Sequence, residues 1–120
     1  MGKPAEAIRE FTRALGTLRI RAKPRHLSDD ISALRRVFQD DGNFAAALRS
    51  VTVQLPKLGT YEAKALQYDL DGWSRIRFSS AINCEADLRI IFRRTTTGVE
   101  LRAFGHRHEP ESVYLRATER

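Results

Sequence analysis

The spacing of apolar residues at the start of the chain predicts a helix over residues 4–15. Ile8, Phe11 and Leu15 recur at helical spacing and would share one face of that helix. The next segment, residues 17–22, alternates apolar and polar positions instead, which is the pattern of a short strand.

A helical hairpin is predicted between residues 28 and 55. Ser28 is a candidate N-cap for its first helix, and Asn43, after the break at residues 40–42, is a candidate N-cap for the second. The apolar stripe of the first helix consists of Ile31, Leu34, Val37 and Phe38, and that of the second consists of Phe44, Leu48, Val51 and Leu55. Two helices joined by so short a link should pack antiparallel, with their stripes covering another layer of the protein.

The apolar period changes from 3.6 to 2 at about residue 61, which indicates strands in the remainder of the chain. The expected strands are residues 73–79, 87–93 and 99–105. Asp71-Gly72 is a turn signal before the first strand, and residues 95–98 join the last two in a hairpin. The segment after Arg107 fits a loop or a short final helix.

This order of elements predicts an α+β fold in a single domain of residues 1–120. The helical hairpin, together with an extra N-terminal helix in residues 1–16, would pack on one face of a small antiparallel sheet. A short C-terminal helix or tail would complete the domain.

Strand alternation separates an arginine-rich face of this sheet from an apolar face. The arginines expected on the basic face are Arg75, Arg77, Arg89, Arg93 and Arg102, joined there by Glu100 and Phe104. The residues expected on the covered face are Ile76, Phe78, Leu88, Ile90, Phe92, Val99, Leu101 and Ala103. Neighbouring guanidinium groups repel each other, and their fork suits phosphate, so we interpret the open face as a phosphate-binding surface. An ordinary solvated sheet face is the alternative.

Composition agrees with a polyanionic partner. The 120 residues carry a formal net charge of +6, with 30% charged residues, which fits nucleic acid or an acidic membrane surface. No apolar run approaches the roughly 20 residues that a membrane span needs, and the start of the chain lacks the apolar core of a secretory signal. The single cysteine, Cys84, fits a reducing cytoplasm, and the histidines and cysteine lack the spacing of metal ligands.

The end of the third strand gathers further candidate chemistry. Gly105 would let the backbone bend or approach a ligand, which would present Arg107 close to the arginines of the neighbouring strands. His106 precedes Arg107 on an alternating strand and would then point to the other face. Tyr114 follows seven positions after Arg107, and it either reaches the basic face or packs the C-terminal segment onto the sheet.

Four short motifs resemble the RelE-like ribonuclease toxins of bacterial toxin–antitoxin pairs. They are Arg75-Ile-Arg77, Leu88-Arg-Ile-Ile-Phe92, Phe104-Gly-His-Arg107 and Val113-Tyr114. The resemblance follows element order over residues 17–120 and is motif-like only from 73 to 114. The strand with Arg89 and the Gly-x-Arg ending also occur in the ParE branch, which poisons DNA gyrase. The paired basic residues and the later tyrosine favour the RNA-cleaving branch.

The resemblance implies an enzyme that enters the ribosomal A site and cuts mRNA by attack of the 2′-hydroxyl on the adjacent phosphate, without a metal or cofactor. It also implies a cognate antitoxin as partner, and a cytoplasmic location without membrane contact. The implied roles are RNA holding for Arg75 and Arg77, phosphorane stabilisation for Arg89, leaving-group protonation or charge neutralisation for Arg107, and base stacking or proton transfer for Tyr114. Arg93 and Arg102 would add RNA contacts.

Three departures from the family pattern affect these roles. Arg75 and Arg77 stand where the family has lysines, and arginine stays protonated, so neither can act as a base. Tyr114 lies one residue further from Arg107 than the family spacing. His106 and His108 are extra titratable groups, and we rank Tyr114 before His106 as the general base.

Two alternative functions follow from the same residues. The chain could be a ParE-like toxin without nuclease activity, or a catalytically inactive module that binds nucleic acid or an antitoxin. The N-terminal helix has no counterpart in the smallest family members, and it either braces the sheet or occupies part of the antitoxin site.

Overall fold

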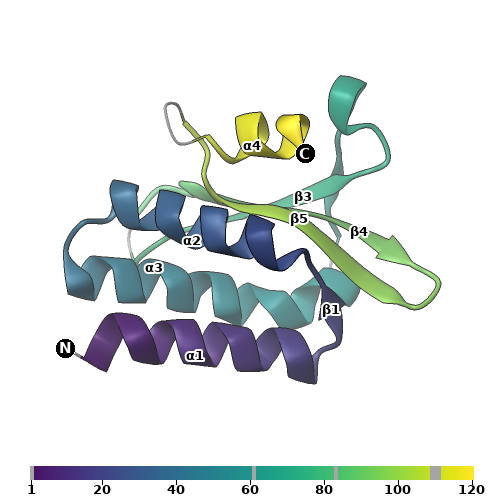
Figure 1. Ribbon diagram of the computed structural model, residues 1–120. Coiled ribbons are helices and arrows are strands. Elements are labelled where there is room, and N and C mark those ends of the chain that lie inside the picture. Colours follow the sequence, from purple (N-terminus) through teal and green to yellow (C-terminus); the bar gives the residue numbers. More distant parts are fainter. Residues whose placement is uncertain (1, 61, 83, 109–111) are drawn as a thin grey trace.

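Five strands form one sheet with three helices on one face and a short helix on the other (Figure 1). The computed structural model describes residues 2–60, 62–82, 84–108 and 112–120. The helices are α1 (Gly2–Thr17), α2 (Pro24–Val37), α3 (Asp41–Gln54) and α4 (Val113–Glu119), and two 3-10 turns are η1 (Leu55–Gly59) and η2 (Tyr68–Leu70). The strands are β1 (Ile20–Arg21), β2 (Lys64–Ala65), β3 (Ser74–Phe78), β4 (Leu88–Thr95) and β5 (Gly98–His106).

The expected α+β class, with helices packed on the sheet, is confirmed. The strand order is β1-β5-β4-β3-β2, and the pairs among β2, β3, β4 and β5 are antiparallel. The sheet is mixed instead of wholly antiparallel, because β1 pairs in parallel with β5. Helices α2 and α3 intervene in the chain between β1 and the antiparallel strands, and such a long connection allows a parallel pairing.

Two predicted helix starts are wrong. Helix α2 begins at Pro24, with Lys23 as the N-cap, so Ser28 lies inside the helix instead of capping it. Proline fits the first helical position because its fixed φ suits the helix and its missing N–H is not needed there. Helix α3 is capped by Asp40, whose carboxylate accepts the N–H of Asn43 at 3.0 Å.

Helix α1 is part of the main hydrophobic core. Phe11 is 1% exposed, and its ring centroid lies 5.0 Å from that of Phe104 on β5. The same core takes apolar side chains from α2, α3 and the sheet, among them Leu34, Phe44, Leu48, Ile90 and Phe92. The N-terminal helix therefore braces the sheet, as one of the two sequence-based alternatives proposed.

A β-bulge in β5 breaks the strict alternation that the sequence predicted. The register shifts between Ile91 and Phe92, which pair with Ala103 and Leu101, so that Arg102 is the extra residue. Ala103 therefore packs with Ile91 on the α4 side of the sheet, and Phe104 enters the main core. The expected positions of Ala103 and Phe104 are corrected by this one inserted residue.

The second sheet face is not open along its whole length. Helix α4 covers its centre, where a smaller cluster of buried side chains forms from Leu70, Trp73, Ile91, Ala103, Val113 and Ala117. Ser112 caps α4 by accepting the backbone N–H of Tyr114 at 3.2 Å. The open basic face that alternation predicted is thus divided by a helix.

Side chains satisfy the outer edge of β5 where β1 has ended. Phe104 donates its N–H to the Asp30 carboxylate at 3.2 Å, and its carbonyl accepts from Arg116 at 2.8 Å. Arg120 donates to the carbonyl of Arg102 at 2.8 Å. Asp30 is 1% exposed and accepts from both Arg116 and Arg120, which ties α4 to α2 around the sheet edge.

Candidate functional site

Three of the predicted arginines lie together on the α4 side of the sheet. Arg77 and Arg89 are cross-strand partners, so their side chains share a face. Arg75 pairs with Ile91, which packs beneath α4, and therefore lies on that face as well. We name the group of Arg75, Arg77, Arg89, Arg107 and Tyr114 the arginine cluster.

Arg89 is the buried member of the cluster. The residue is only 6% exposed. Its Nη1 donates to the carbonyls of Ala86 at 2.6 Å and Leu88 at 2.9 Å. Its Nε is buried and has no hydrogen-bond acceptor among the described residues. A buried donor without an acceptor is costly, so this Nε favours an added anionic partner.

The charges around Arg89 connect it to three other members of the cluster. Burial lowers the pKa of Arg89, and the positive charges of Arg75 and Arg107 lower this pKa further. Tyr114, beside the guanidinium, opposes this lowering of the Arg89 pKa. Guanidinium groups that destabilise each other in this way gain from an anion placed between them.

Arg107 follows β5 and is held by its backbone. Its N–H donates to the carbonyl of Asp87 at 3.0 Å, while its Nη2 donates to Glu85 at 2.9 Å. Glu85 is 84% exposed, so this ion pair contributes little and can yield to a stronger ligand. The Nε of Arg107 is buried without an acceptor in the described part of the chain, as is that of Arg89.

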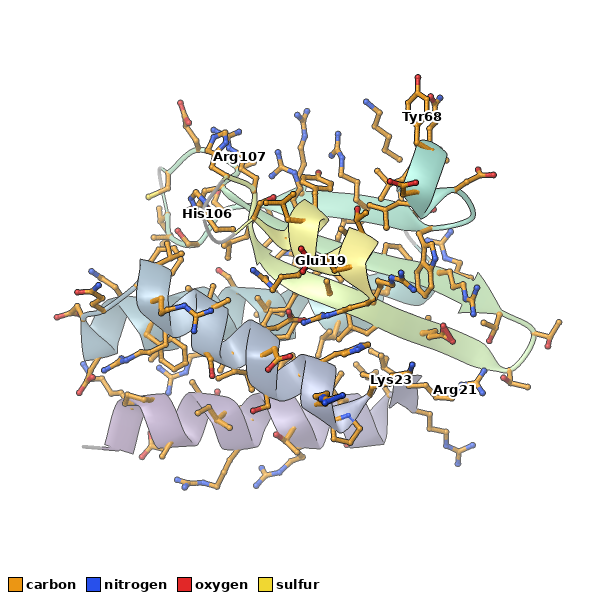
Figure 2. The ribbon with its side chains drawn as sticks, turned by 45° about the horizontal axis from the view of Figure 1, so that its top comes forward. Arg21, Lys23, Tyr68, His106, Arg107 and Glu119 are labelled. Carbon is orange, nitrogen blue, oxygen red and sulfur yellow. The ribbon has the colours of Figure 1, made fainter. Side chains whose placement is uncertain are left out.

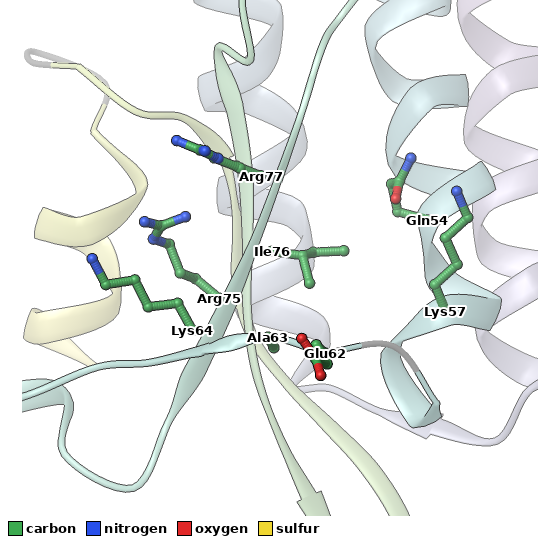
Figure 3. A pocket seen from close by; sticks show the side chains of 8 residues that line it. All are labelled: Gln54, Lys57, Glu62, Ala63, Lys64, Arg75, Ile76 and Arg77. Carbon is green, nitrogen blue, oxygen red and sulfur yellow. The ribbon is translucent and has the colours of Figure 1, made fainter.

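Arg75 and Arg77 border an open cavity of about 600 Å³ at the outer edge of β3. Figure 3 shows both arginines and Lys64 directed to the α4 side of this strand, with Gln54 and Lys57 on the other side. Within the residues that the structure describes, neither arginine takes part in an ion pair, so both remain able to bind a ligand. Lys64 pairs with Arg75 across β2 and β3. A strand of two residues such as β2 shows no period, so the sequence did not predict this contact.

Tyr114 fulfils both roles that the sequence left open. It lies in the first turn of α4, half-buried, and packs against the smaller apolar cluster. Its phenol also acts on the guanidinium of Arg89. Tyr114 therefore packs α4 onto the sheet and places a hydroxyl beside the most buried arginine.

His106 lies on the opposite side of the sheet from Arg89. It pairs with Leu88, which belongs to the main core, whereas Arg89 pairs with Gly105. The His106 Nδ1 accepts the N–H of His108 at 3.2 Å. Burial lowers the pKa of His106, and Asp87 partly opposes this shift. The structure thus leaves His106 away from the cluster to which the sequence assigned it as second candidate base.

Gly105 is required by packing. Its φ is +148°, and a Cβ at this position would lie 2.5 Å from the Nη2 of Arg116. Arg116 crosses over β5 at the position opposite Arg89, so a larger residue would displace the guanidinium that binds Asp30. The glycine therefore gives room to the side chain of Arg116, whereas the sequence predicted that it would let the backbone bend or approach a ligand.

Arg93 and Arg102 lie at the other end of the sheet face. Their guanidinium carbons are 4.5 and 4.9 Å from the ring centroid of Trp73. Arg93 pairs with Glu100 at 2.9 Å, and the Nε of Arg102 donates to the carbonyl of Ala117 at 2.9 Å. The predicted RNA-binding residues are thus divided into two groups.

Helix α4 separates these two basic regions. In Figure 2, Arg107 lies at one end of the sheet and Arg21 and Lys23 lie at the other, with Glu119 of α4 between them. Arg93 and Arg102 share a cavity of about 460 Å³ with Arg21 and Lys23, and we name this cavity the second basic pocket.

No helix among the described residues is long and apolar enough to cross a membrane. No group of three or more histidine, cysteine, aspartate or glutamate side chains among them could hold a metal ion.

No protein-family model, curated protein or solved structure matches this chain. Function is therefore inferred from the geometry and charge of the arginine cluster.

Proposed function

We propose that this protein is the toxin of a type II toxin–antitoxin pair and a ribosome-dependent endoribonuclease that cuts mRNA. The observation that supports this most strongly is the arginine cluster itself. Arg89 and Arg107 each keep a buried Nε without an acceptor among the described residues, and Tyr114 acts on the guanidinium of Arg89. Such a site fits a phosphate that accepts several charged hydrogen bonds at once.

The reaction would be an internal transfer at one phosphate of the mRNA. The 2′-oxygen attacks the adjacent phosphorus, the bond to the 5′-oxygen breaks, and the products are a 2′,3′-cyclic phosphate and a 5′-hydroxyl. Negative charge builds on the non-bridging oxygens as the phosphorane forms. Arg89 and Arg107 would stabilise this charge with fixed donors, which is the most effective form of electrostatic catalysis.

Proton transfer is assigned to Tyr114. Its side chain lies beside the guanidinium of Arg89. His106, the other candidate base, lies on the opposite face of the sheet. Arg75 and Arg77 would grip the strand on either side of the cut, with Lys64 adding a third basic contact.

The proposed partners follow from this substrate. The enzyme would act in the cytoplasm on mRNA in the ribosomal A site, and an antitoxin would cover the arginine cluster until it is released. Neither a metal nor a small-molecule cofactor has a step in this reaction.

A phosphate-binding module that does not cut RNA is the second candidate. The anchoring of Arg89 to two carbonyls and the ion pair of Arg107 with Glu85 favour it, because both arrangements also serve a purely structural role. The phenol of Tyr114 has a chemical role only in the nuclease, so a variant that lacks this hydroxyl distinguishes the two candidates.

Tyr114→Phe and Arg107→Ala test the proposal. Expression of the wild type without an antitoxin should arrest bacterial growth, and primer extension should locate cuts within translated messages. Each variant should lower cleavage by about 10-fold or more, because one lost transition-state contact is worth on the order of 1.4 kcal/mol.

The matched control is Arg13→Ala, which removes one exposed positive charge from α1. This helix lies on the opposite side of the sheet from α4 (Figure 1). It should cleave like the wild type. Continued growth with intact messages at full expression of folded protein would rule out the nuclease. Normal cleavage by Tyr114→Phe would rule out the assigned role of the phenol.

A further inference from the structure

The second basic pocket is assembled from segments that are far apart in the chain. Its lining includes Arg21, Lys23, His26, Arg93, Arg102 and Arg120. These residues come from β1, the start of α2, the hairpin of β4 and β5, and the end of the chain after α4. Folding thus brings together basic groups that repel each other, although none of them belongs to the main hydrophobic core.

Two of these guanidinium groups are fixed in position. The Nε of Arg102 donates to the carbonyl of Ala117, while the ring of Trp73 lies 4.9 Å away. Arg120 is bound to Asp30 and to the carbonyls of Arg102 and His26. These contacts use both Nη atoms of Arg120, so Arg120 supplies positive charge to the pocket. The guanidinium of Arg102 is already ordered and therefore loses less entropy when it binds a ligand.

The positive charge of the pocket is not balanced within it. Glu100 pairs with Arg93, and Asp30 is buried between Arg116 and Arg120. Burial lowers the pKa of His26, and the charges of Arg120, Lys23 and Arg102 lower this pKa further, with Asp30 opposing them. His26, at the wall of the pocket, is therefore surrounded by more positive than negative charge.

The first turn of α2 adds to this potential. Lys23 is the N-cap residue, its side chain forms no capping hydrogen bond, and the first turn contains no acidic residue. The positive end of the helix dipole at Pro24 is thus left uncompensated beside a cavity that is already lined by basic side chains.

The chemistry of the lining favours a phosphate over a flat or apolar ligand. Trp73 is 9% exposed and lies against two guanidinium groups, so its ring is not free to stack with a base. Arginine forks with fixed geometry match the oxygens of a phosphate. The pocket also lies on the same sheet face as the arginine cluster, with α4 between the two sites.

We propose that the second basic pocket is a phosphate-binding site that holds a backbone phosphate of the same RNA strand that the arginine cluster grips. The choice of RNA as the source rests on the proposed function, whereas the phosphate site itself does not. The strand would then run across the face of the sheet past α4.

A phosphate titration tests the site itself. Amide chemical shifts of ¹⁵N-labelled protein are followed while inorganic phosphate is added at constant ionic strength. Saturable shifts are expected at Lys23, His26 and Arg102. The double variant Arg21→Gln/Lys23→Gln should weaken this binding by about 5-fold or more, because charged hydrogen bonds are lost.

The control is Arg9→Gln/Arg13→Gln, which removes the same charge from α1 and should bind phosphate like the wild type. Absence of saturable shifts in the wild type would overturn the site. Equal weakening in both double variants would also overturn it, since the effect would then reflect net charge alone.

A second experiment, with an RNA oligonucleotide as the ligand, tests whether the phosphate belongs to RNA. The affinity for a 2′-O-methyl oligonucleotide of about 20 nucleotides is measured against salt concentration, where each phosphate contact on a single strand contributes a slope of about −0.7. Arg21→Gln/Lys23→Gln should reduce the slope by about one contact or more relative to the α1 control. Equal slopes would overturn RNA as the source and would leave a small phosphorylated ligand in its place.

Failure of the proposed function gives a different result. The nuclease proposal fails if the wild-type protein cuts no message and the variant Arg75→Gln/Arg77→Gln binds RNA as tightly as the wild type does. Saturable phosphate shifts at Lys23, His26 and Arg102 would still establish the second basic pocket in that case.

Discussion

Arg89 is the residue on which the electrostatics of the arginine cluster depend most. Its guanidinium bonds two backbone carbonyls and interacts with Tyr114, while Arg75 and Arg107 repel it. Lysine carries the same charge but cannot reproduce this fork.

Arg89→Lys should therefore lower both stability and cleavage. We expect the free energy of unfolding to fall by about 1–3 kcal/mol, because at least one carbonyl loses its charged donor. Cleavage should fall by about 10-fold or more. Urea denaturation and a cleavage assay measure the two effects, with Arg13→Lys at an exposed position of α1 as the control. Wild-type stability in Arg89→Lys would show that the carbonyl contacts are dispensable.

Two histidines should make the protein less stable in mild acid. Burial lowers the pKa of His26 and of His106 below the ordinary value. Just below pH 6.5 the unfolded chain therefore binds more protons than the folded one, so the free energy of unfolding falls as pH falls through this range.

His106→Gln should reduce this pH dependence. Urea denaturation at pH 7.5, 6.5 and 5.5 compares it with the wild type and with His108→Gln, which changes an exposed side chain. An identical decline in His106→Gln and the wild type would mean that His106 protonates as easily in the folded state as in the unfolded state.

Residue-level reasoning from the sequence succeeded where strands are regular and failed at one insertion. Alternation placed Arg75, Arg77 and Arg89 on one face, as the register shows. It misplaced Ala103 and Phe104, because a bulge of one residue leaves no trace in the hydrophobic pattern.

The elements are held together by contacts that local sequence patterns do not reveal. In a helix capped by Ser28, Asp30 would lie in the first turn, yet α2 begins at Pro24 and Asp30 lies one turn further in. There it bonds Arg116, Arg120 and the N–H of Phe104. One carboxylate thus joins α2, β5 and α4.

Asp30→Asn should loosen α4. Removing the charge leaves two buried guanidinium groups without their partner, and breaking a buried ion pair costs about 3–5 kcal/mol. Hydrogen exchange of the α4 amides and the free energy of unfolding measure the effect. Asp29→Asn, the exposed neighbour on the same helix, serves as the control. Equal protection of α4 in the two variants would show that Asp30 does not hold this helix.

Helix periodicity predicted α1, α2 and α3, but not what α4 covers. The period of 3.6 is a strong signal over three or four turns, whereas strands of two residues such as β1 and β2 have too few positions to show a period. The position of α4 depends on contacts with Asp30 and with β5 that lie far away in the sequence.

At the scale of the whole molecule, a three-helix layer supports one sheet whose other face presents two basic regions. Helix α1 is integral to this layer, since Phe11 packs on Phe104 of β5. Helix α4 divides the opposite face into the arginine cluster and the second basic pocket (Figure 2). These two basic regions contribute to the net charge of +6 and lie on the face where we propose that RNA binds.

The convergence of distant guanidinium groups was the part of the site that the sequence predicted best. Strand order alone brought Arg75, Arg77 and Arg89 together, and the segment after β5 brought Arg107 and Tyr114 to them. The separation of Arg93 and Arg102 was not predictable, because it results from α4 packing across the sheet.

The most direct test is the cleavage of a ribosome-bound message by the purified protein. Two messages are compared that differ by a single 2′-deoxynucleotide at the position where the all-ribose message is cut. The account predicts cleavage of the ribose message into 2′,3′-cyclic phosphate and 5′-hydroxyl ends, with no cut at the deoxy position. Equal cleavage of both messages, or intact messages with folded protein, would contradict it.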